Sequence, residues 1–343
     1  MSGGALAVAG AGGGYAAFHG MGSLDEYQAS VAVTRAALRQ TPEIREFVRF
    51  ATLAASGHST QPWTFHIGAN RIDILPDFSR RTPVVDPDGH RLYVSLDCAG
   101  ENLALAAGGR GRPGELRFDP ASDGAVVFAF TSGKAKVSAL SDAIPVRQSS
   151  RTDFDGKLIS GADLILITDR PQIDRIRDIV IAGNSTQMAD RAFVNELKNW
   201  LRISPRLAIQ MRDGLFSASG GNPTLPACLG PHIFDWVFKT GPENDNYARQ
   251  IASSPGIAVF IGQKDDREHW VLAGRDCHRF ALQAKAMGMK HAFIIQPVEV
   301  PSLRPELAAL VGMPGRRSDT AMRFGFGPAL PYSAHRPVEA VMA

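Results

Sequence analysis

Two alanine-rich segments, more than half the chain apart, carry the same Asp-Cys pair. Asp97-Cys98 lies within residues 93–108, and Asp276-Cys277 lies within residues 270–288. Both segments have the composition of a buried helix, and each is followed by a glycine-containing turn and a strand-like run. A duplicated module fused in tandem leaves this pattern, although a two-residue match also arises by coincidence. The sequence leaves both interpretations open.

The length and charge of the chain limit the classes of protein to which it can belong. With 343 residues it exceeds the usual size of a single core, so one large domain or two fused domains are expected. The 37 basic and 34 acidic residues are spread along the chain, so nucleic acid is not an expected partner. The three cysteines include no CxxC pair, and neither a disulfide framework nor a zinc site is expected.

Residues 1–24 form a segment of their own that contains no Asp, Glu, Lys or Arg. Their Gly/Ala-rich run is typical of the core of a twin-arginine export signal, but no Arg-Arg pair precedes it. A truncated signal would predict a periplasmic protein, and a flexible tail would suit a cytoplasmic one. The sequence does not decide between them. No later segment is long and apolar enough to span a membrane.

Hydrophobic periodicity divides the remaining chain into a first half, residues 25–140, and a second half, residues 141–343. Helices are predicted at residues 25–55, 93–108, 171–183, 184–201 and 270–288. Strands are predicted at residues 63–67, 72–75, 115–118, 125–130, 164–167, 257–261, 292–295 and 322–326. Residues 214–232, rich in Gly, Ser and Pro, are predicted to form a long loop, which is usually functional in a compact enzyme.

Arg147-Gln148-Ser149-Ser150-Arg151 places two guanidinium groups and a hydroxyl at alternate positions. In an extended segment the side chains of Arg147, Ser149 and Arg151 point to one side, where they can meet a single anionic group. Guanidinium forks match phosphate oxygens and bind them through charge-assisted hydrogen bonds. Taken alone, the pentad also fits a solvated loop.

The segment from Ser56 to Trp63 joins a predicted helix to a predicted strand. Gly57 permits close backbone approach to a ligand, and exposed amides at such a turn are good donors to a polar heterocycle. Pro62 restricts the backbone as the chain leaves the turn, and the Trp63 indole can anchor it in the core. The alternative interpretation is a tight turn with a structural tryptophan.

Together these motifs resemble the flavin-dependent nitroreductases. Ala54 to Trp63 looks like the family's Pro-Ser-x-x-Asn-x-Gln-Pro-Trp element, and residues 147–151 are similar to its Arg-x-Ser-x-Arg flavin-phosphate motif. Residues 324–328, followed by Arg336-Pro337, look like its closing glycine-rich strand and terminal arginine. The order of the motifs resembles the Acg-like branch, in which two nitroreductase-type halves are fused and imitate the usual homodimer. The likeness runs from about residue 45 to residue 337.

The resemblance implies an α+β fold of two fused half-modules, each a mainly antiparallel sheet flanked by helices, with FMN between them. Arg147, Ser149 and Arg151 would then hold the phosphate and ribityl chain, and Arg336 would close on the phosphate or the ring. The remaining cofactor-binding residues would approach the ring itself: Ser56, Gly57 and Ser59 from the first half, and Gln296 and Pro297 near flavin N5.

Two departures from the family pattern matter. Ser59 stands where the family has an asparagine, so a side-chain amide contact is lost or shortened. Residues 25–140 contain no second Arg-x-Ser-x-Arg, which predicts a single FMN per chain and a degenerate second site.

Other kinds of site find less support. Gln61 stands where a serine-hydrolase elbow needs glycine, and Ser219-Gly220-Gly221 lacks the strand and helix that flank a dinucleotide-binding loop. That loop is a candidate lid over the flavin. The histidines lack metal-ligand spacing, so no metal site is expected, and no catalytic residue is assigned. The aromatic residues of 234–238 pack in the core or cap the ring.

The resemblance implies an FMN-binding oxidoreductase that takes hydride from NAD(P)H and reduces a nitroaromatic, quinone or similar small-molecule acceptor. The alternative is a non-catalytic protein that sequesters FMN under a lid. A monomer that acts as a pseudo-dimer and a homodimer both fit the sequence.

Overall fold

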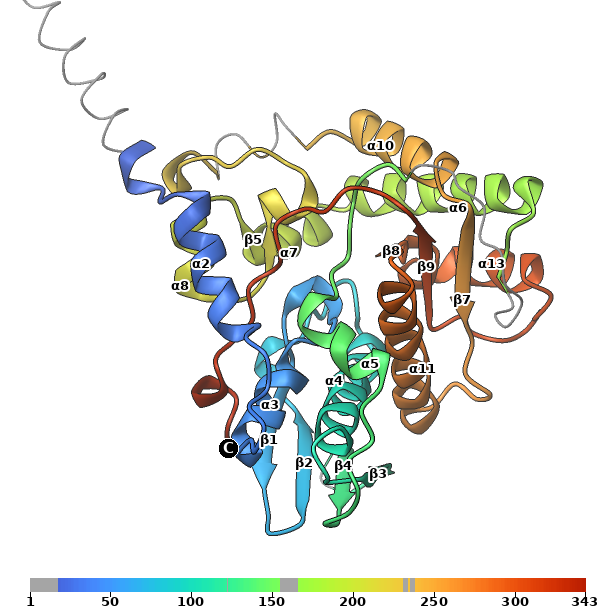
Figure 1. Ribbon diagram of the computed structural model, residues 1–343. Coiled ribbons are helices and arrows are strands. Elements are labelled where there is room, and N and C mark those ends of the chain that lie inside the picture. Colours follow the sequence, from blue (N-terminus) through green and yellow to red (C-terminus); the bar gives the residue numbers. More distant parts are fainter. Residues whose placement is uncertain (1–17, 122, 155–165, 231–233, 235–237) are drawn as a thin grey trace, which may run out of the picture.

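The computed structural model describes residues 18–121, 123–154, 166–230, 234 and 238–343 (Figure 1). Most of the expected export signal or tail, the start of the strand predicted at 164–167, and Trp236 lie outside the described residues. Within them, no helix has the length and apolar character needed to cross a bilayer.

The first half alternates helices with the strands of one sheet. Its elements are, in chain order, α2 (Leu24–Thr34), α3 (Ile44–Thr52), η1 (Gly57–Ser59), β1 (Trp63–Ile67), β2 (Arg71–Pro76), η2 (Phe78–Arg80), α4 (His90–Gly108), β3 (Gly114–Asp119), β4 (Ala125–Phe130), α5 (Ala139–Ala143) and η3 (Ile144–Val146).

The second half begins with helices and ends with strands. Its elements are α6 (Arg170–Ala189), α7 (Arg191–Trp200), β5 (Leu201–Arg202), α8 (Pro205–Met211), β6 (Leu215–Phe216), η4 (Ser217–Gly220), η5 (Ala227–Leu229), α10 (Thr240–Ala252), β7 (Gly256–Phe260), α11 (Arg267–Ala286), β8 (Lys290–Phe293), α12 (Gln296–Glu299), η6 (Pro301–Leu303), α13 (Arg304–Leu310), β9 (Thr320–Gly325) and η7 (Val338–Ala340).

The mixed α+β class with mainly antiparallel sheets is confirmed. The first sheet has the order β1-β2-β4-β3 and the second β7-β9-β8, with every neighbouring pair antiparallel. Only the short β5-β6 pair is parallel among the described strands.

One supersecondary unit occurs twice. In the first half, β2, α4, β3 and β4 follow one another, and their strands lie in the order β2-β4-β3. In the second half, β7, α11, β8 and β9 repeat the strand order, with α12, η6 and α13 inserted between β8 and β9. The two helices that carry the Asp-Cys pairs therefore occupy equivalent places in the two units.

The two helices α4 and α11 lie side by side at the centre of the molecule (Figure 1). Their contact, called the seam below, is very close: a Cβ atom added at Gly274 would lie 2.0 Å from the carbonyl oxygen of Val94. Arg275 pairs with the fully buried Asp97 at 2.8 Å. Burial raises the pKa of Asp97 to about 7, and Arg275 opposes this increase.

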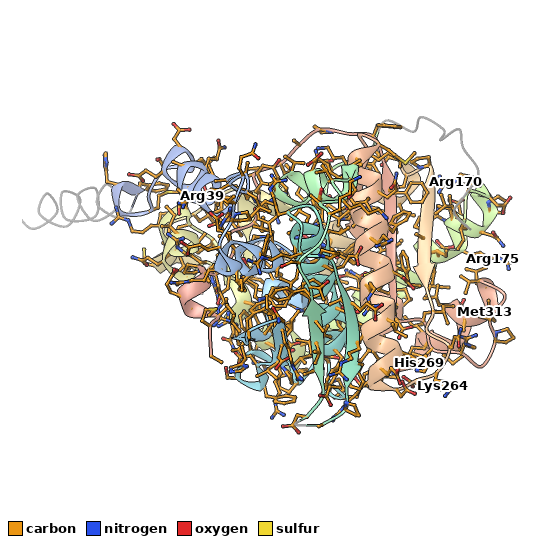
Figure 2. All side chains as sticks on the ribbon, turned by 60° about the horizontal axis from the view of Figure 1, so that its bottom comes forward. Arg39, Arg170, Arg175, Lys264, His269 and Met313 are labelled. Carbon is orange, nitrogen blue, oxygen red and sulfur yellow. The ribbon has the colours of Figure 1, made fainter. Side chains whose placement is uncertain are left out.

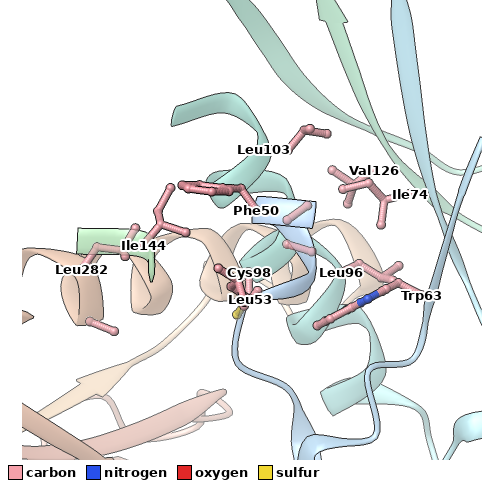
Figure 3. Packing of buried hydrophobic residues seen from close by; sticks show 14 of the residues in the cluster. Phe50, Leu53, Trp63, Ile74, Leu96, Cys98, Leu103, Val126, Ile144 and Leu282 are labelled. Carbon is pink, nitrogen blue, oxygen red and sulfur yellow. The ribbon is translucent and has the colours of Figure 1, made fainter. Parts of the chain in front are cut away.

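A single hydrophobic core spans both halves. It joins side chains of the first sheet and α4, such as Trp63 and Leu96, to side chains of α11 and β9, such as Phe280 and Phe324. Figure 3 shows Leu96 and Leu103 of α4 beside Trp63, Ile74 and Val126 of the first sheet, with Leu282 of α11 in the same cluster. A separate cluster of the described residues contains Phe216, which lines the site described below.

Residues 326–343 return from β9 to the first half (Figure 1). Phe65 of β1 donates its amide to Val341 O at 2.7 Å and accepts from the Ala343 amide at 2.9 Å. This return segment, placed in the second half by the sequence, thus extends the edge of the first sheet.

Two predicted helices have different boundaries in the structure. Residues 25–55 form α2 and α3 rather than one helix, because Pro42 cannot donate a backbone hydrogen bond and restricts the residue before it. The break between α6 and α7 lies at Asp190, whose side chain caps α7 by accepting the Ala192 amide.

Charged side chains are distributed over the surface of both halves. Figure 2 shows Arg39 at one end of the molecule and Arg170, Arg175 and Lys264 at the other. The dispersion matches the mixed charge of the sequence.

Candidate functional site

The turn between α3 and β1 has an unusual backbone. His58, Ser59 and Gln61 have positive φ angles of 47°, 52° and 52°, a region that costs non-glycine residues about 1–3 kcal/mol each. Local hydrogen bonds close the turn: the Ser59 amide donates to Ser56 O, and the Gln61 amide donates to Ser56 Oγ. Such strain persists only where the surrounding structure imposes it.

The fully buried Gln61 side chain ties this turn to two distant segments. Its Nε2 donates to Arg212 O at 2.9 Å, and its Oε1 accepts from the Arg336 amide at 2.7 Å. The Gly214 amide also donates to Ser59 O at 3.0 Å. The Arg336 guanidinium donates to Gln61 O at 3.2 Å, so this arginine supports the turn from behind.

Replacing Gln61 with alanine is expected to lower the free energy of unfolding by about 2–4 kcal/mol, because Arg212 O and the Arg336 amide both lose a buried partner. Urea denaturation measures the change. Gln61→Gly removes the same bonds but relieves the positive φ, so it should cost less than Gln61→Ala. The exposed Gln210 on α8 provides the control, since Gln210→Ala should change stability by less than about 0.5 kcal/mol. Equal effects of Gln61→Ala and Gln210→Ala would contradict the expectation.

The Arg-x-Ser-x-Arg segment runs as an extended chain beside β8. Ser149 forms a parallel bridge with His291, and the Ser150 amide donates to His291 O at 2.8 Å. Arg147, Ser149 and Arg151 line a common cavity, and Ser150 is not among its lining residues. Gln148 lines the same cavity, so the three predicted side chains meet there without a strict alternation.

Two buried cations lie close together at this cavity. The Arg147 guanidinium donates to Leu53 O at 2.9 Å, and Arg35 donates to Arg147 O at 3.1 Å. Burial lowers the pKa of Arg147 to about 10. Burial, and then the charge of Arg147, lowers the pKa of Arg35 to about 9. In both cases burial disfavours the charged form of the guanidinium, so the site keeps two positive charges away from water.

The cavity, called the arginine cavity below, opens between the two halves, and its volume of about 920 Å³ includes space open to solvent. Four arginines line it: Arg35, Arg91, Arg147 and Arg151. No aspartate or glutamate is among the described residues of its wall. Arg91 has a counterion outside the wall, Glu299 at 3.3 Å, which leaves the other three without a carboxylate partner among the described residues. This arrangement favours an anionic ligand.

Ser56, Gly57 and Ser59 of the strained turn form the opposite wall of the arginine cavity. Residues predicted from both motifs are thus brought together, although more than eighty residues separate the motifs. Arg336 and Pro297 do not line the cavity.

Several buried polar atoms around the arginine cavity have no hydrogen-bond partner among the described residues. They include Nε of Arg35 and of Arg147, and Nδ1 of His58 and of His335. Buried polar atoms are normally satisfied, so this group of orphans indicates a place where a polar ligand binds.

A second space, called the aromatic cavity below, adjoins the first, and its volume of about 1070 Å³ includes space open to solvent. Phe193, Phe216, Phe238, Tyr247 and Phe293 contribute to its wall, and Gln296 also lines it. The two cavities share His58, Arg151 and Phe216 as wall residues. Part of the long loop predicted at 214–232 forms this shared wall, since Leu215 also faces both cavities.

Two residues of the site, Arg35 and His58, were not predicted from the sequence. Arg35 follows α2 outside any motif, and its guanidinium lies 4.2 Å from the centre of the Tyr332 ring in the return segment. His58 stands at a variable position of the turn motif. Burial, and then the charges of Arg91 and Arg151, lower the pKa of His58 to about 3, so its imidazole is neutral.

Comparison with known proteins supports the resemblance drawn from the motifs. The chain is 25% identical over 309 residues to a protein of Mycobacterium tuberculosis (strain CDC 1551 / Oshkosh) named "Putative NAD(P)H nitroreductase". The same identity relates it to a protein of that name from strain ATCC 25618 / H37Rv. Each alignment covers 83% of this chain and 85% of the relative. No protein-family model matches the chain.

Proposed function

We propose that the protein is an FMN-dependent oxidoreductase of the nitroreductase type, which takes hydride from NAD(P)H and reduces a nitroaromatic, quinone or similar acceptor. The observation that carries this proposal is the arginine cavity, where the Arg-x-Ser-x-Arg segment meets the strained turn across the two halves. The names of the two mycobacterial relatives support the reaction class.

The residues of the arginine cavity fit a flavin nucleotide. Its phosphate carries about two negative charges, and an anion of that kind would satisfy the orphaned Nε atoms of Arg35 and Arg147. In this proposal Arg147, Ser149 and Arg151 hold the phosphate and ribityl chain, and Arg35 adds a fourth contact. The charge of the ligand would also offset the burial that lowers the pKa values of Arg35 and Arg147.

The opposite wall would position the ring. Ser56, Gly57 and Ser59 approach it from the first half, and the strain of their turn fixes where their backbone groups point. Gln296, in the aromatic cavity, approaches from the second half. When bound, FMN supplies the hydride chemistry, while the protein binds and orients it and excludes water. No side chain is assigned as an acid, a base or a metal ligand, and the described residues contain no group of three candidate metal ligands.

We further propose that the chain consists of two fused nitroreductase-like halves that imitate a homodimer, as in the Acg-like branch. The repeated strand–helix–strand–strand unit supports this, because the same topology meets itself along the seam. Residues 25–140 lack an Arg-x-Ser-x-Arg segment, which supports one FMN per chain.

Anaerobic mixing of the FMN-loaded protein with NADPH or NADH is expected to bleach the absorbance of the flavin in the visible blue region. The aromatic cavity offers the nicotinamide a place beside the arginine cavity. Stopped-flow absorbance measures the rate, and dithionite reduction of the same sample defines the end point. Protein that stays colourless after incubation with excess FMN would contradict the cofactor assignment.

A second candidate function is FMN sequestration without turnover. It is favoured by the way Leu215 and Phe216 wall both cavities, as a cover over a bound ring would. Bleaching by dithionite but by neither nicotinamide nucleotide would select this function over the oxidoreductase.

A further inference from the structure

Two cysteines face each other across the seam. Cys98 of α4 and Cys277 of α11 have their Sγ atoms 4.0 Å apart, and both residues line the arginine cavity. Both are buried, whereas Cys228, the third cysteine of the chain, is exposed. The sequence analysis expected no disulfide, since the two cysteines lie far apart and in different halves.

The surrounding structure holds the two sulfur atoms in this arrangement. Both thiols donate to the same acceptor, Gly274 O, at 3.3 and 3.2 Å. Gly274 lets the two helices approach, because any side chain there would strike the backbone at Val94. A disulfide requires a sulfur separation of about 2.05 Å, so each sulfur would move by only about 1 Å.

Ion pairs along the seam fix the register of the two helices. Arg275 pairs with Asp97 and Arg279 pairs with Glu101, each at 2.8 Å. Ion pairs therefore join the two helices within one turn of the cysteine pair. The short Sγ–Sγ distance and these ion pairs together place the two sulfur atoms where a small movement can join them.

The surroundings of the cysteine pair have opposing effects on the pKa of Cys277. Hydrogen bonding to Cys98 and burial hold the pKa of Cys277 well above its ordinary value, which keeps the thiol protonated. The guanidinium groups of Arg91 and Arg147 also interact with the pair, and positive charge favours the thiolate that reacts. The pair should therefore react more slowly than an exposed thiol, and only with reagents small enough to enter the cavity.

We propose that Cys98 and Cys277 form an oxidisable dithiol that hydrogen peroxide converts into a disulfide joining the two halves beneath the arginine cavity. One thiol gives up its proton and attacks the O–O bond, which yields a sulfenic acid and one water. The second thiol then displaces water from the sulfenic sulfur. Overall, two thiols and one peroxide give one disulfide and two waters. The proposal does not depend on the flavin assignment.

The test uses the full-length chain with Cys228→Ser, which leaves the buried pair as the only cysteines. The reduced protein, without added FMN, is treated with hydrogen peroxide, and thiols are counted with Ellman's reagent in denaturant. The expected result is a fall from two thiols to none, with a loss of about 2 Da in intact mass that dithiothreitol reverses. The oxidised chain should stay monomeric on a non-reducing gel. It should also melt at a higher temperature than the reduced chain, since the crosslink closes a long loop.

Cys98→Ser in the same background is the matched control. It retains Cys277 in the same surroundings, so it should show no loss of 2 Da and no rise in melting temperature. The oxidising conditions are calibrated on the wild-type chain, as the peroxide concentration and time at which the exposed Cys228 thiol is fully consumed. The proposal is overturned if ten times that exposure leaves both thiols of the Cys228→Ser protein titratable, or if the only disulfide formed joins two chains.

Discussion

Arg147→Met is expected to weaken FMN binding by about a hundredfold, and the variant should purify without colour. The Arg147 side chain is buried, and its Nε lacks a partner among the described residues. A charge-assisted hydrogen bond contributes about 1.5–3 kcal/mol, and a factor of ten in affinity corresponds to about 1.4 kcal/mol. Two such bonds from one guanidinium fork to a phosphate account for the expected loss.

Titration of the FMN-free protein, followed by quenching of flavin fluorescence, measures this affinity. Arg117→Met on β3 removes an exposed cation and should leave the affinity unchanged. The FMN-free Arg147→Met protein loses the buried hydrogen bond to Leu53 O but no longer buries a guanidinium whose pKa is lowered, so its stability should change little. Full retention of FMN by the variant would remove Arg147 from the phosphate site.

Gly274→Ala is expected to lower the free energy of unfolding by about 3 kcal/mol or more, at the upper end of overpacking effects. The new Cβ would lie 2.0 Å from Val94 O and 2.8 Å from its carbonyl carbon, so the backbone of α4 must shift. Such a shift opens the seam under the arginine cavity, and the affinity for FMN should fall as well. Urea denaturation, with and without FMN, measures both effects.

Gly108→Ala at the end of α4 is the matched control for this change. A Cβ there meets nothing within 4 Å, so the substitution should be neutral or stabilise the protein by up to about 1 kcal/mol through the unfolded state. If Gly274→Ala proved as stable as Gly108→Ala, the close approach of the two helices would not be essential to the fold.

Much of the fold followed from local patterns. The helix of the first Asp-Cys pair was predicted nearly to its bounds, because its apolar run is long and rich in alanine and leucine, which favours a buried helix over a strand. The break between α2 and α3 was missed because helical periodicity continues past Pro42, although proline removes the hydrogen bond that the helix needs there.

Some residues of the candidate site could be predicted from the sequence, and others could not. The sequence predicted that Arg147, Ser149 and Arg151 lie together, because an extended segment has a period of two. It did not predict that Gln148 lines the same cavity. Arg35 could not be predicted as a site residue, because its place at the cavity depends on the packing of α2 against the return segment. The sequence also placed Arg336 at the flavin, but no local pattern shows that its guanidinium is committed to the backbone of Gln61.

The return segment has a consequence for the order in which the chain can fold during synthesis. The outer edge of β1 receives its hydrogen bonds at Phe65 from residues 341 and 343, which are made only after β9. A nascent chain that already contains the whole first sheet therefore still exposes an unpaired strand edge, the kind of surface that pairs with other chains. Binding of a chaperone to the first half would protect it until the ribosome has delivered the segment that covers this edge.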